Sequence, residues 1–156
     1  MRLRIVAVGR AKSGPEAALI DDYLTRFNRT GRALGLGPAE VVEVDDRKSR
    51  GPAGGATALA AALPSGAALI ALDERGRLIS SPDFARILAD RRDLGTRDCA
   101  ILIGGADGLS PALRARADVT LSFGKMVWPH LLARVMLAEQ LYRASTILAG
   151  GPYHRA

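Results

Sequence analysis

The sequence predicts an α/β fold built on one mostly parallel sheet with helices on both faces. Short aliphatic runs alternate along the chain with segments that carry helix-start signals or apolar residues at helical spacing. Such alternation of strands and helices is typical of a parallel sheet that is covered on both sides. The chain has 156 residues, and neither a linker nor an internal repeat divides it. We therefore expect a single domain over 1–156.

The first half of the chain predicts two strands and two helices. Residues 2–8 are rich in Ile and Val and predict a strand, and a helix follows from about Pro15. Its apolar residues recur at the i, i+3, i+4, i+7 spacing of a buried face: Ile20, Tyr23, Leu24 and Phe27. Residues 41–44 predict a short strand. The polar, glycine-rich stretch 45–55 predicts a loop, and the small residues 56–63 a helix.

The second half predicts three more strands and three more helices. Ser81 and Pro82 are typical of a helix start, with Ser81 as the N-cap, and Ser110 precedes a proline in the same way. The longest helix is predicted over 129–148. It is apolar on nearly every face, which is typical of a buried helix and indicates a partner subunit. The remaining strands are predicted at 67–72, 99–103 and 119–122.

The charge balance favours a polyanionic partner without requiring one. The net charge is +6 and the pI about 10.2, and a basic surface suits nucleic acid. Most of the basic residues are Arg, and Ala and Gly are abundant, so a coding bias could produce the same charge. Aromatic residues are only 4% of the chain, which argues against a broad surface for stacking single-stranded bases.

Several classes of protein are disfavoured by composition. The single Cys99 allows no internal disulfide and suits a reducing cytosol, so we expect a cytoplasmic protein. The apolar run at the N-terminus is too short for a signal peptide, and no stretch is long enough to predict a membrane span. Two histidines and one cysteine, far apart, are too few for a structural zinc site, so no metal is expected.

Three loops are predicted to leave the carboxyl ends of strands, where ligands gather in open α/β sheets. They are LDERG (72–76), IGGADGLSP (103–111) and LSFGKMVWPH (121–130). The paired glycines of the second loop could let the backbone approach a flat ligand or could simply form a tight turn. The third loop could wrap an adenine or could cover the core. No loop carries a dinucleotide or triphosphate motif.

A few polar side chains near these loops are candidates for chemistry. His130 begins the last helix, where it could cap, pack or act on a proton, and Arg134 lies one turn later. Glu139 and Arg143 have the spacing of an ordinary i, i+4 ion pair. The C-terminal sequence GGPYHRA contains Tyr153, His154 and Arg155, whose side chains could bind an anion, stack or accept a proton, although chain ends usually fray.

The motifs together resemble the ribosomal large subunit methyltransferase H family, of the SPOUT class of knotted methyltransferases. The matching stretches are LRIVAVGR (3–10), ILIGGADGLSP (101–111), LSFGKMVWPHLLARVMLAEQLYRA (121–144) and PYHR (152–155). The resemblance covers the whole chain and is weakest over about 30–65. It departs from the family at Val127, where Thr is usual, and at Trp128, where an aliphatic residue or Phe is usual.

The resemblance implies a methyl transfer from S-adenosylmethionine to N3 of a pseudouridine in 23S rRNA within the ribosome. It also implies a homodimer with a C-terminal trefoil knot. The implied cofactor contacts are Leu72, Gly104, Gly105, Leu121, Ser122, Phe123, Gly124, Lys125, Met126, Val127 and Trp128. Tyr153, His154 and Arg155 are expected to close over the cofactor beside the partner's pocket. His154 is the first candidate for the base, and His130 the second. The expected RNA contacts are Arg134, Arg143 and Arg155.

Two other functions remain open at the level of sequence. A ribosome- or RNA-binding module of the same fold could have lost catalysis, for which the Val127 departure is the only support. A flavodoxin-like nucleotide enzyme would need a phosphate loop after the first strand, and GRAKSGP (9–15) is a poor one.

Overall fold

The structure is a computed structural model that describes residues 1–45, 52–105 and 107–155. Five strands form one parallel sheet in the order β2-β1-β4-β3-β5. The strands are β1 (Arg2–Val8), β2 (Ala39–Val44), β3 (Ala68–Leu78), β4 (Asp98–Ile103) and β5 (Val119–Ser122). The helices are α1 (Pro15–Gly31), the short 3-10 helix η1 (Arg32–Leu34), α2 (Pro52–Ala61), α3 (Ser81–Asp93), α4 (Pro111–Arg116) and α5 (His130–Leu148). The predicted α/β architecture is confirmed.

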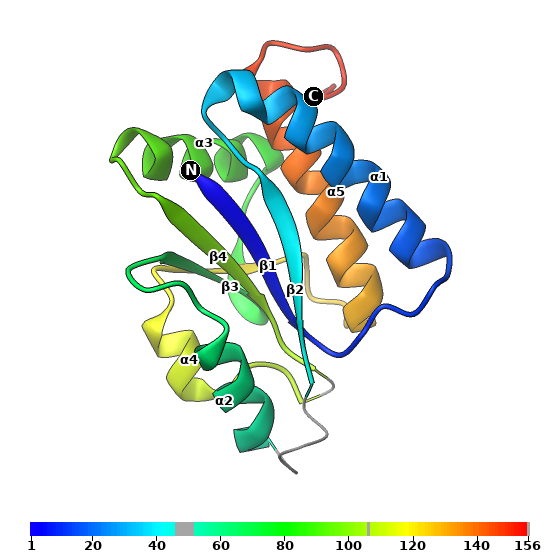
Figure 1. The fold of residues 1–156 in the computed structure, drawn as a ribbon, viewed down its shortest axis with the longest axis vertical. Helices are drawn as coiled ribbons and strands as arrows, with labels where there is room; N and C mark the ends of the chain where they lie inside the picture. Colours follow the sequence, from blue (N-terminus) through cyan, green and yellow to red (C-terminus); the bar gives the residue numbers. More distant parts are fainter. Residues whose placement is uncertain (46–51, 106, 156) are drawn as a thin grey trace.

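The helices form a layer on each side of the sheet (Figure 1). One layer contains α1, α3 and α5, and the other contains α2 and α4. Alternation along β1 explains how one strand serves both layers: Leu3 and Ile5 face the first layer, while Val6 and Val8 face the second. All six residues of β4 are buried, and the five after Asp98 are apolar, as suits a strand that is covered on both faces.

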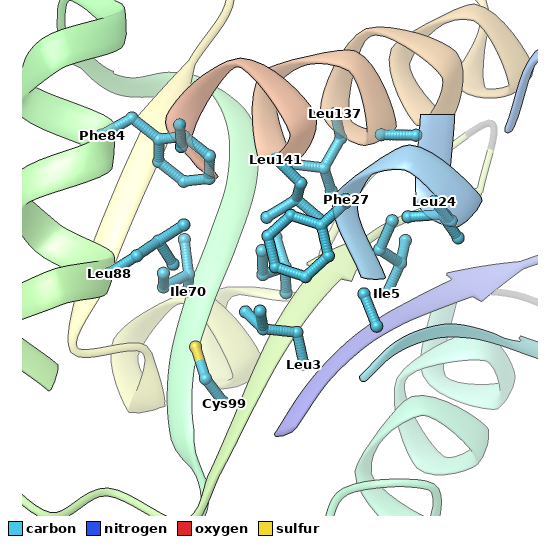
Figure 2. Close-up of a cluster of buried hydrophobic side chains, with 14 of the residues drawn as sticks. Leu3, Ile5, Leu24, Phe27, Ile70, Phe84, Leu88, Cys99, Leu137 and Leu141 are labelled. Atoms are coloured by element: carbon cyan, nitrogen blue, oxygen red, sulfur yellow. The ribbon is translucent and has the colours of Figure 1, made fainter. Parts of the chain in front are cut away.

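The larger core lies under α5 (Figure 2). Leu137 and Leu141 of α5 meet Phe27 of α1 above β1 and β4, and Phe84 of α3 lies beside them. The polar residues Ser145 and Thr146 of α5 are buried too, and their hydroxyls donate to backbone carbonyls one turn earlier. No helix in the described ranges combines the length and apolar character of a membrane span.

The structure changes three details of the predicted elements. The N-cap of α3 is Ser80 and not Ser81, because the Ser80 hydroxyl accepts from the Asp83 amide in a reciprocal capping box. Helix α2 begins at Pro52, within the predicted loop 45–55, of which 46–51 lies outside the described residues. Strand β3 continues to Leu78, six residues past its predicted end.

The extension of β3 has a backbone explanation. Leu72 and Arg77 both pair with Leu121 of β5, so the residues between them bulge out of the ladder. Gly76 lies where β3 returns to β5, and a Cβ there would lie 2.4–2.7 Å from backbone atoms of Leu121. Sequence periodicity does not reveal such a crossing, because the polar residues of LDERG are typical of a loop.

We expect the packing of α5 to dominate the stability of the domain. Leu141 is fully buried, so Leu141→Ala should lower the free energy of unfolding by about 2–5 kcal/mol through lost burial and a residual cavity. Leu94→Ala is the matched control, because Leu94 is 79% exposed, and its cost should stay within about 0.5 kcal/mol. Denaturant unfolding at one fixed protein concentration measures both. Equal losses in the two variants would contradict this description of the core.

Candidate active site

One pocket, called the principal pocket because it contains residues of all three predicted loops, lies at the carboxyl ends of β4 and β5 and beside the bulge of β3. It has a volume of about 280 Å³, close to the lower end of the roughly 300–1,000 Å³ of small-molecule sites. All three predicted loops contribute to it. Its lining consists of Leu72, Asp73, Glu74, Arg75, Ile103, Gly104, Gly105, Asp107, Gly108, Ser122, Phe123, Gly124, Met126, Val127, Trp128, His130 and Ala133.

A second pocket of about 320 Å³ shares Leu72, Ser122 and Phe123 with the first. It lies between β3, the start of α3 and the middle of α5, and most of its lining is apolar. Leu121 contributes to this pocket and not to the first. The Leu72 and Ser122–Phe123 segments therefore border two adjoining spaces.

Close backbone contact explains the glycines of the IGGADG loop. A Cβ on Gly104 would lie 2.3–2.8 Å from backbone atoms of Gly108, closer than real Cβ atoms come. Gly105 and Gly108 form an isolated antiparallel bridge, and Gly108 has a φ of +72°, which suits glycine. The loop thus folds back on itself beside the pocket. The close contact with Gly108 is by itself a sufficient reason for glycine at position 104, without any ligand.

The loop after β5 is organised around Ser122 and Gly124. The Ser122 hydroxyl accepts from the Gly124 amide at 3.2 Å and donates to the Gly124 carbonyl at 2.9 Å. Gly124 has a φ of +127°, so the chain turns sharply there. Beyond it Met126 and Val127 are exposed at 73% and 81%. These side chains border the pocket without being buried in it.

Arg114 of α4 connects two of the pocket loops. Its guanidinium donates to the Asp73 carboxylate at 3.3 Å and to the Leu109 carbonyl at 2.6 Å. The Asp73 side chain is only 5% exposed, so its charge needs such a partner. Arg114 therefore holds the LDERG loop against the end of the IGGADG loop.

His130 is the histidine that the structure places in the pocket. It is exposed at the first position of α5. A Cβ on Gly9 would lie 3.8 Å from its Nε2, so the loop after β1 borders the same mouth. An exposed imidazole in a pocket can exchange a proton with a ligand.

The predicted RNA contact at Arg134 is wrong in this structure. Its side chain is fully buried, and its guanidinium donates to Glu43 Oε1 at 2.8 Å. It also donates to the backbone carbonyls of Val8 and Gly9 at 3.3 and 3.2 Å. Burial lowers the pKa of Arg134, opposed by the nearby Glu43 charge. A guanidinium with no exposed surface cannot meet a phosphate, and no sequence pattern around Arg134 indicated its burial.

The C-terminal segment is docked against α5 instead of fraying. The Tyr153 hydroxyl donates to Glu139 Oε1 at 3.0 Å, and its ring lies under the Arg143 guanidinium at 4.8 Å. Arg143 pairs with Glu139, as its spacing predicts, and lies 3.4 Å from His154 Nδ1. Burial, reinforced by the hydrogen bond to Glu139, raises the pKa of Tyr153. The tyrosine therefore stays a neutral donor.

These contacts place the tail away from its own chain's pocket. Tyr153, His154 and Arg155 line neither pocket. The anchor Glu139 lies nine residues along α5 from His130, about 13 Å at 1.5 Å per residue. Arg143 is tied to Glu139, so its predicted RNA contact requires that pair to open, while Arg155 is exposed.

A hydrogen-bonded chain nevertheless connects the tail with the second pocket. The Ser81 hydroxyl donates to Gln140 Oε1 at 2.7 Å, and Gln140 Nε2 donates to Glu139 Oε2 at 2.9 Å. Glu139 then accepts from Tyr153 and Arg143. Ser81 and Gln140 both line that pocket.

Most of the predicted cofactor residues meet at the principal pocket. The exceptions are Leu121, which lines the second pocket, and Lys125, which is exposed and lines neither. The prediction omitted Asp73, Glu74 and Arg75, although LDERG was already identified as a loop at a strand end. Their position after an aliphatic strand was the signal that could have found them. Within the described ranges no three His, Cys, Asp or Glu side chains lie together as metal ligands would.

Comparison with known proteins gives one family over nearly the whole chain. The model of the predicted SPOUT methyltransferase family matches residues 1–154. The chain is 66% identical to "Ribosomal RNA large subunit methyltransferase H" of Ruegeria pomeroyi over 155 residues, which cover 99% of each chain. The protein of the same name from Roseobacter denitrificans is also 66% identical, with the same coverage.

Solved structures share the fold at low sequence identity. A probable methyltransferase from Bordetella pertussis has a TM-score of 0.53 and 18% identity, covering 92% of this chain and 96% of that one. TrmJ from Z. mobilis has a TM-score of 0.54 and 16% identity, covering 92% of this chain and 70% of that one. These likenesses bear on the fold alone.

We expect Gly104→Ala to abolish S-adenosylmethionine binding while leaving the domain folded. The added Cβ would force the Gly108 backbone away and distort the loop that borders the pocket. Gly14→Ala is the control, because Gly14 has an ordinary extended φ of 176° and a Cβ there meets only atoms at 3.5 Å or beyond. Calorimetric titration compares the two variants. Wild-type affinity in Gly104→Ala would remove this loop from the cofactor site.

We expect Val127→Thr to leave S-adenosylmethionine affinity within about twofold of the wild type. The Val127 side chain is 81% exposed, so a hydroxyl there would be solvated and would add little net binding energy. The same titration measures the change. A gain of tenfold or more would show that the family's usual threonine binds the cofactor directly and that Val127 weakens this site.

Proposed function

The chain belongs to the SPOUT methyltransferase family, and from this premise we propose that it methylates N3 of a pseudouridine in 23S rRNA with S-adenosylmethionine. The observation that carries the proposal is the 66% identity, over 99% of each chain, to relatives named for large-subunit rRNA methylation. Family membership also implies the C-terminal knot of the SPOUT fold. A ribosomal substrate would place the activity in the cytoplasm.

The principal pocket fits the cofactor that SPOUT methyltransferases use. Leu72, Phe123 and Trp128 offer apolar surface for an adenine, and the Gly104–Gly105 segment brings backbone groups to the same space. When bound, S-adenosylmethionine supplies an activated methyl group. The chain's own task is to hold N3 in line with that methyl, which supplies much of the acceleration.

The chain must also accept a proton from N3. Two imidazoles are available, and the structure separates them. His130 lies in the principal pocket, whereas His154 lies beside Arg143 on the far part of α5. At either place, an imidazole ring nitrogen that carries no hydrogen could accept this proton.

We assign the role of the base that accepts the N3 proton to His154, and we propose that a second subunit provides this residue. With the tail docked on Glu139, Tyr153, His154 and Arg155 do not line the pocket of their own chain. A homodimer that brings α5 of one subunit beside the pocket of the other would complete the site. Leu78, Met126, Trp128 and Leu132 support such an interface, because they are large apolar side chains exposed at 40–73% near the pocket.

The alternative of an inactive binding module gains no support from Val127. Its exposed side chain removes the reason for expecting a lost cofactor contact at that position. The decisive experiment is mass spectrometry of 23S rRNA from cells with and without this protein. Loss of one N3-methylated pseudouridine, restored by the wild-type gene and not by Gly104→Ala, is the expected result. An unchanged methylation pattern would contradict the proposal.

Deleting Tyr153–Ala156 should abolish methyl transfer while leaving folding and cofactor binding intact. These residues follow α5 and contribute little to the core. His154→Ala alone should slow transfer roughly 10²–10⁴-fold if His154 is the base, and His130→Ala is the parallel test of the second candidate. Single-turnover methylation of purified ribosomal subunits measures each rate.

Mixing the tail deletion with Gly104→Ala tests the shared site. A mixed dimer contains one intact pocket facing one intact tail, so two inactive proteins should together recover part of the activity. Wild-type rates from the tail deletion alone would show that the tail is dispensable, and no recovery on mixing would contradict a site built from two subunits.

A further inference from the structure

We infer that the loop 9–14, between β1 and α1, binds the rRNA phosphates that flank the target nucleoside. The inference rests on the proposed function and names a surface for its substrate. The loop carries Arg10 and Lys12, which were not among the predicted RNA contacts. Three observations carry it: the position of the loop, its unpaired cations and the buried support beneath it.

The loop borders the mouth of the principal pocket. It leaves the carboxyl end of β1, at the same edge of the sheet as the loops that line the pocket. Gly9 lies close to His130, since a Cβ on Gly9 would be 3.8 Å from His130 Nε2. An RNA strand that brings a base into this pocket must carry its neighbouring phosphates over the rim.

The second observation concerns the two cations of this loop. Arg10 and Lys12 are exposed, and within residues 1–45, 52–105 and 107–155 neither has an ion pair or side-chain hydrogen bond. Many other arginines are paired, as Arg4 is with Glu40 and Arg26 with Asp22. Free cations at the mouth of a site are what a polyanionic substrate requires.

The start of the loop is fixed from below by buried groups. Arg134 donates to the carbonyls of Val8 and Gly9, and Glu43 pairs with Arg134 and accepts from the Ala11 amide at 2.7 Å. The Gly9 amide donates to the Val44 carbonyl at 2.9 Å. An exposed loop of small and polar residues needs no such support for packing. These hydrogen bonds hold the backbone from which Arg10 and Lys12 project in a defined position beside His130.

The chemistry of the loop favours phosphates over bases. The loop sequence GRAKSG (9–14) offers two cations, a serine hydroxyl and backbone amides, and it has no aromatic side chain on which a base could stack. Contacts of this type position a nucleic acid without reading its sequence. The loop should therefore contribute affinity and orientation rather than choice of nucleotide.

The test compares Arg10→Gln/Lys12→Gln with Arg29→Gln/Arg32→Gln. Both variants lose two exposed cations, and the control pair lies at the opposite end of α1. The measurements are binding of an rRNA fragment containing the target at several salt concentrations, methylation kinetics on ribosomal subunits, and calorimetry with S-adenosylmethionine. In the loop variant, the slope of log K against log salt concentration should become less steep by about 1.4, as expected for the loss of two contacts to single-stranded phosphates.

The loop variant should also raise KM for the ribosomal substrate by about tenfold or more at moderate salt, with kcat and cofactor affinity little changed. The control should resemble the wild type. Equal weakening of rRNA binding in both variants would show that only the net charge matters and would overturn the inference. An unchanged salt dependence of binding in the loop variant would overturn it too. Wild-type protein that binds but never methylates rRNA would contradict the proposed function instead, while the salt slopes would still decide the inference.

Discussion

The burial of Arg134 is the constraint on which the geometry of the site depends. Its guanidinium joins the ends of β1 and β2 to the first turns of α5, three segments that are far apart in the sequence. Removing one partner of such a buried pair typically costs about 3–5 kcal/mol, because the remaining charge is left uncompensated. The start of α5, and with it His130, is thereby fixed against the loop after β1.

Local sequence signals were enough to predict the architecture, but they did not predict where backbone segments far apart in the sequence come into contact. Aliphatic runs identified all five strands, and Ser110 with its following proline identified α4 correctly. The signals failed where two distant backbones meet. Strand β3 resumes beyond its bulge because Gly76 allows the backbone of Leu121 to approach, and no residue pattern within LDERG encodes that partner.

The same distinction applies to the site. Most of the residues that the family motifs predict as cofactor contacts line one pocket, because these motifs lie at the carboxyl ends of neighbouring strands. Whether they bind the cofactor stays a prediction. Arg134 was misassigned because its position, one turn after His130, says nothing about whether that side of the helix faces solvent or β1. The docking of Tyr153 on Glu139 was equally hidden, since it depends on how the chain returns along α5.

Charge shows most clearly why composition alone misleads about function. The net charge of +6 suggests a broadly basic surface, yet the arginines at 2, 4, 26 and 143 are each neutralised by a carboxylate. Screening also weakens any isolated cation that is more than about 10 Å from a bound phosphate. What a nucleic acid experiences is therefore set by the few unpaired cations near the pocket. Among the described residues these cations include Arg10 and Lys12, which no ion pair neutralises.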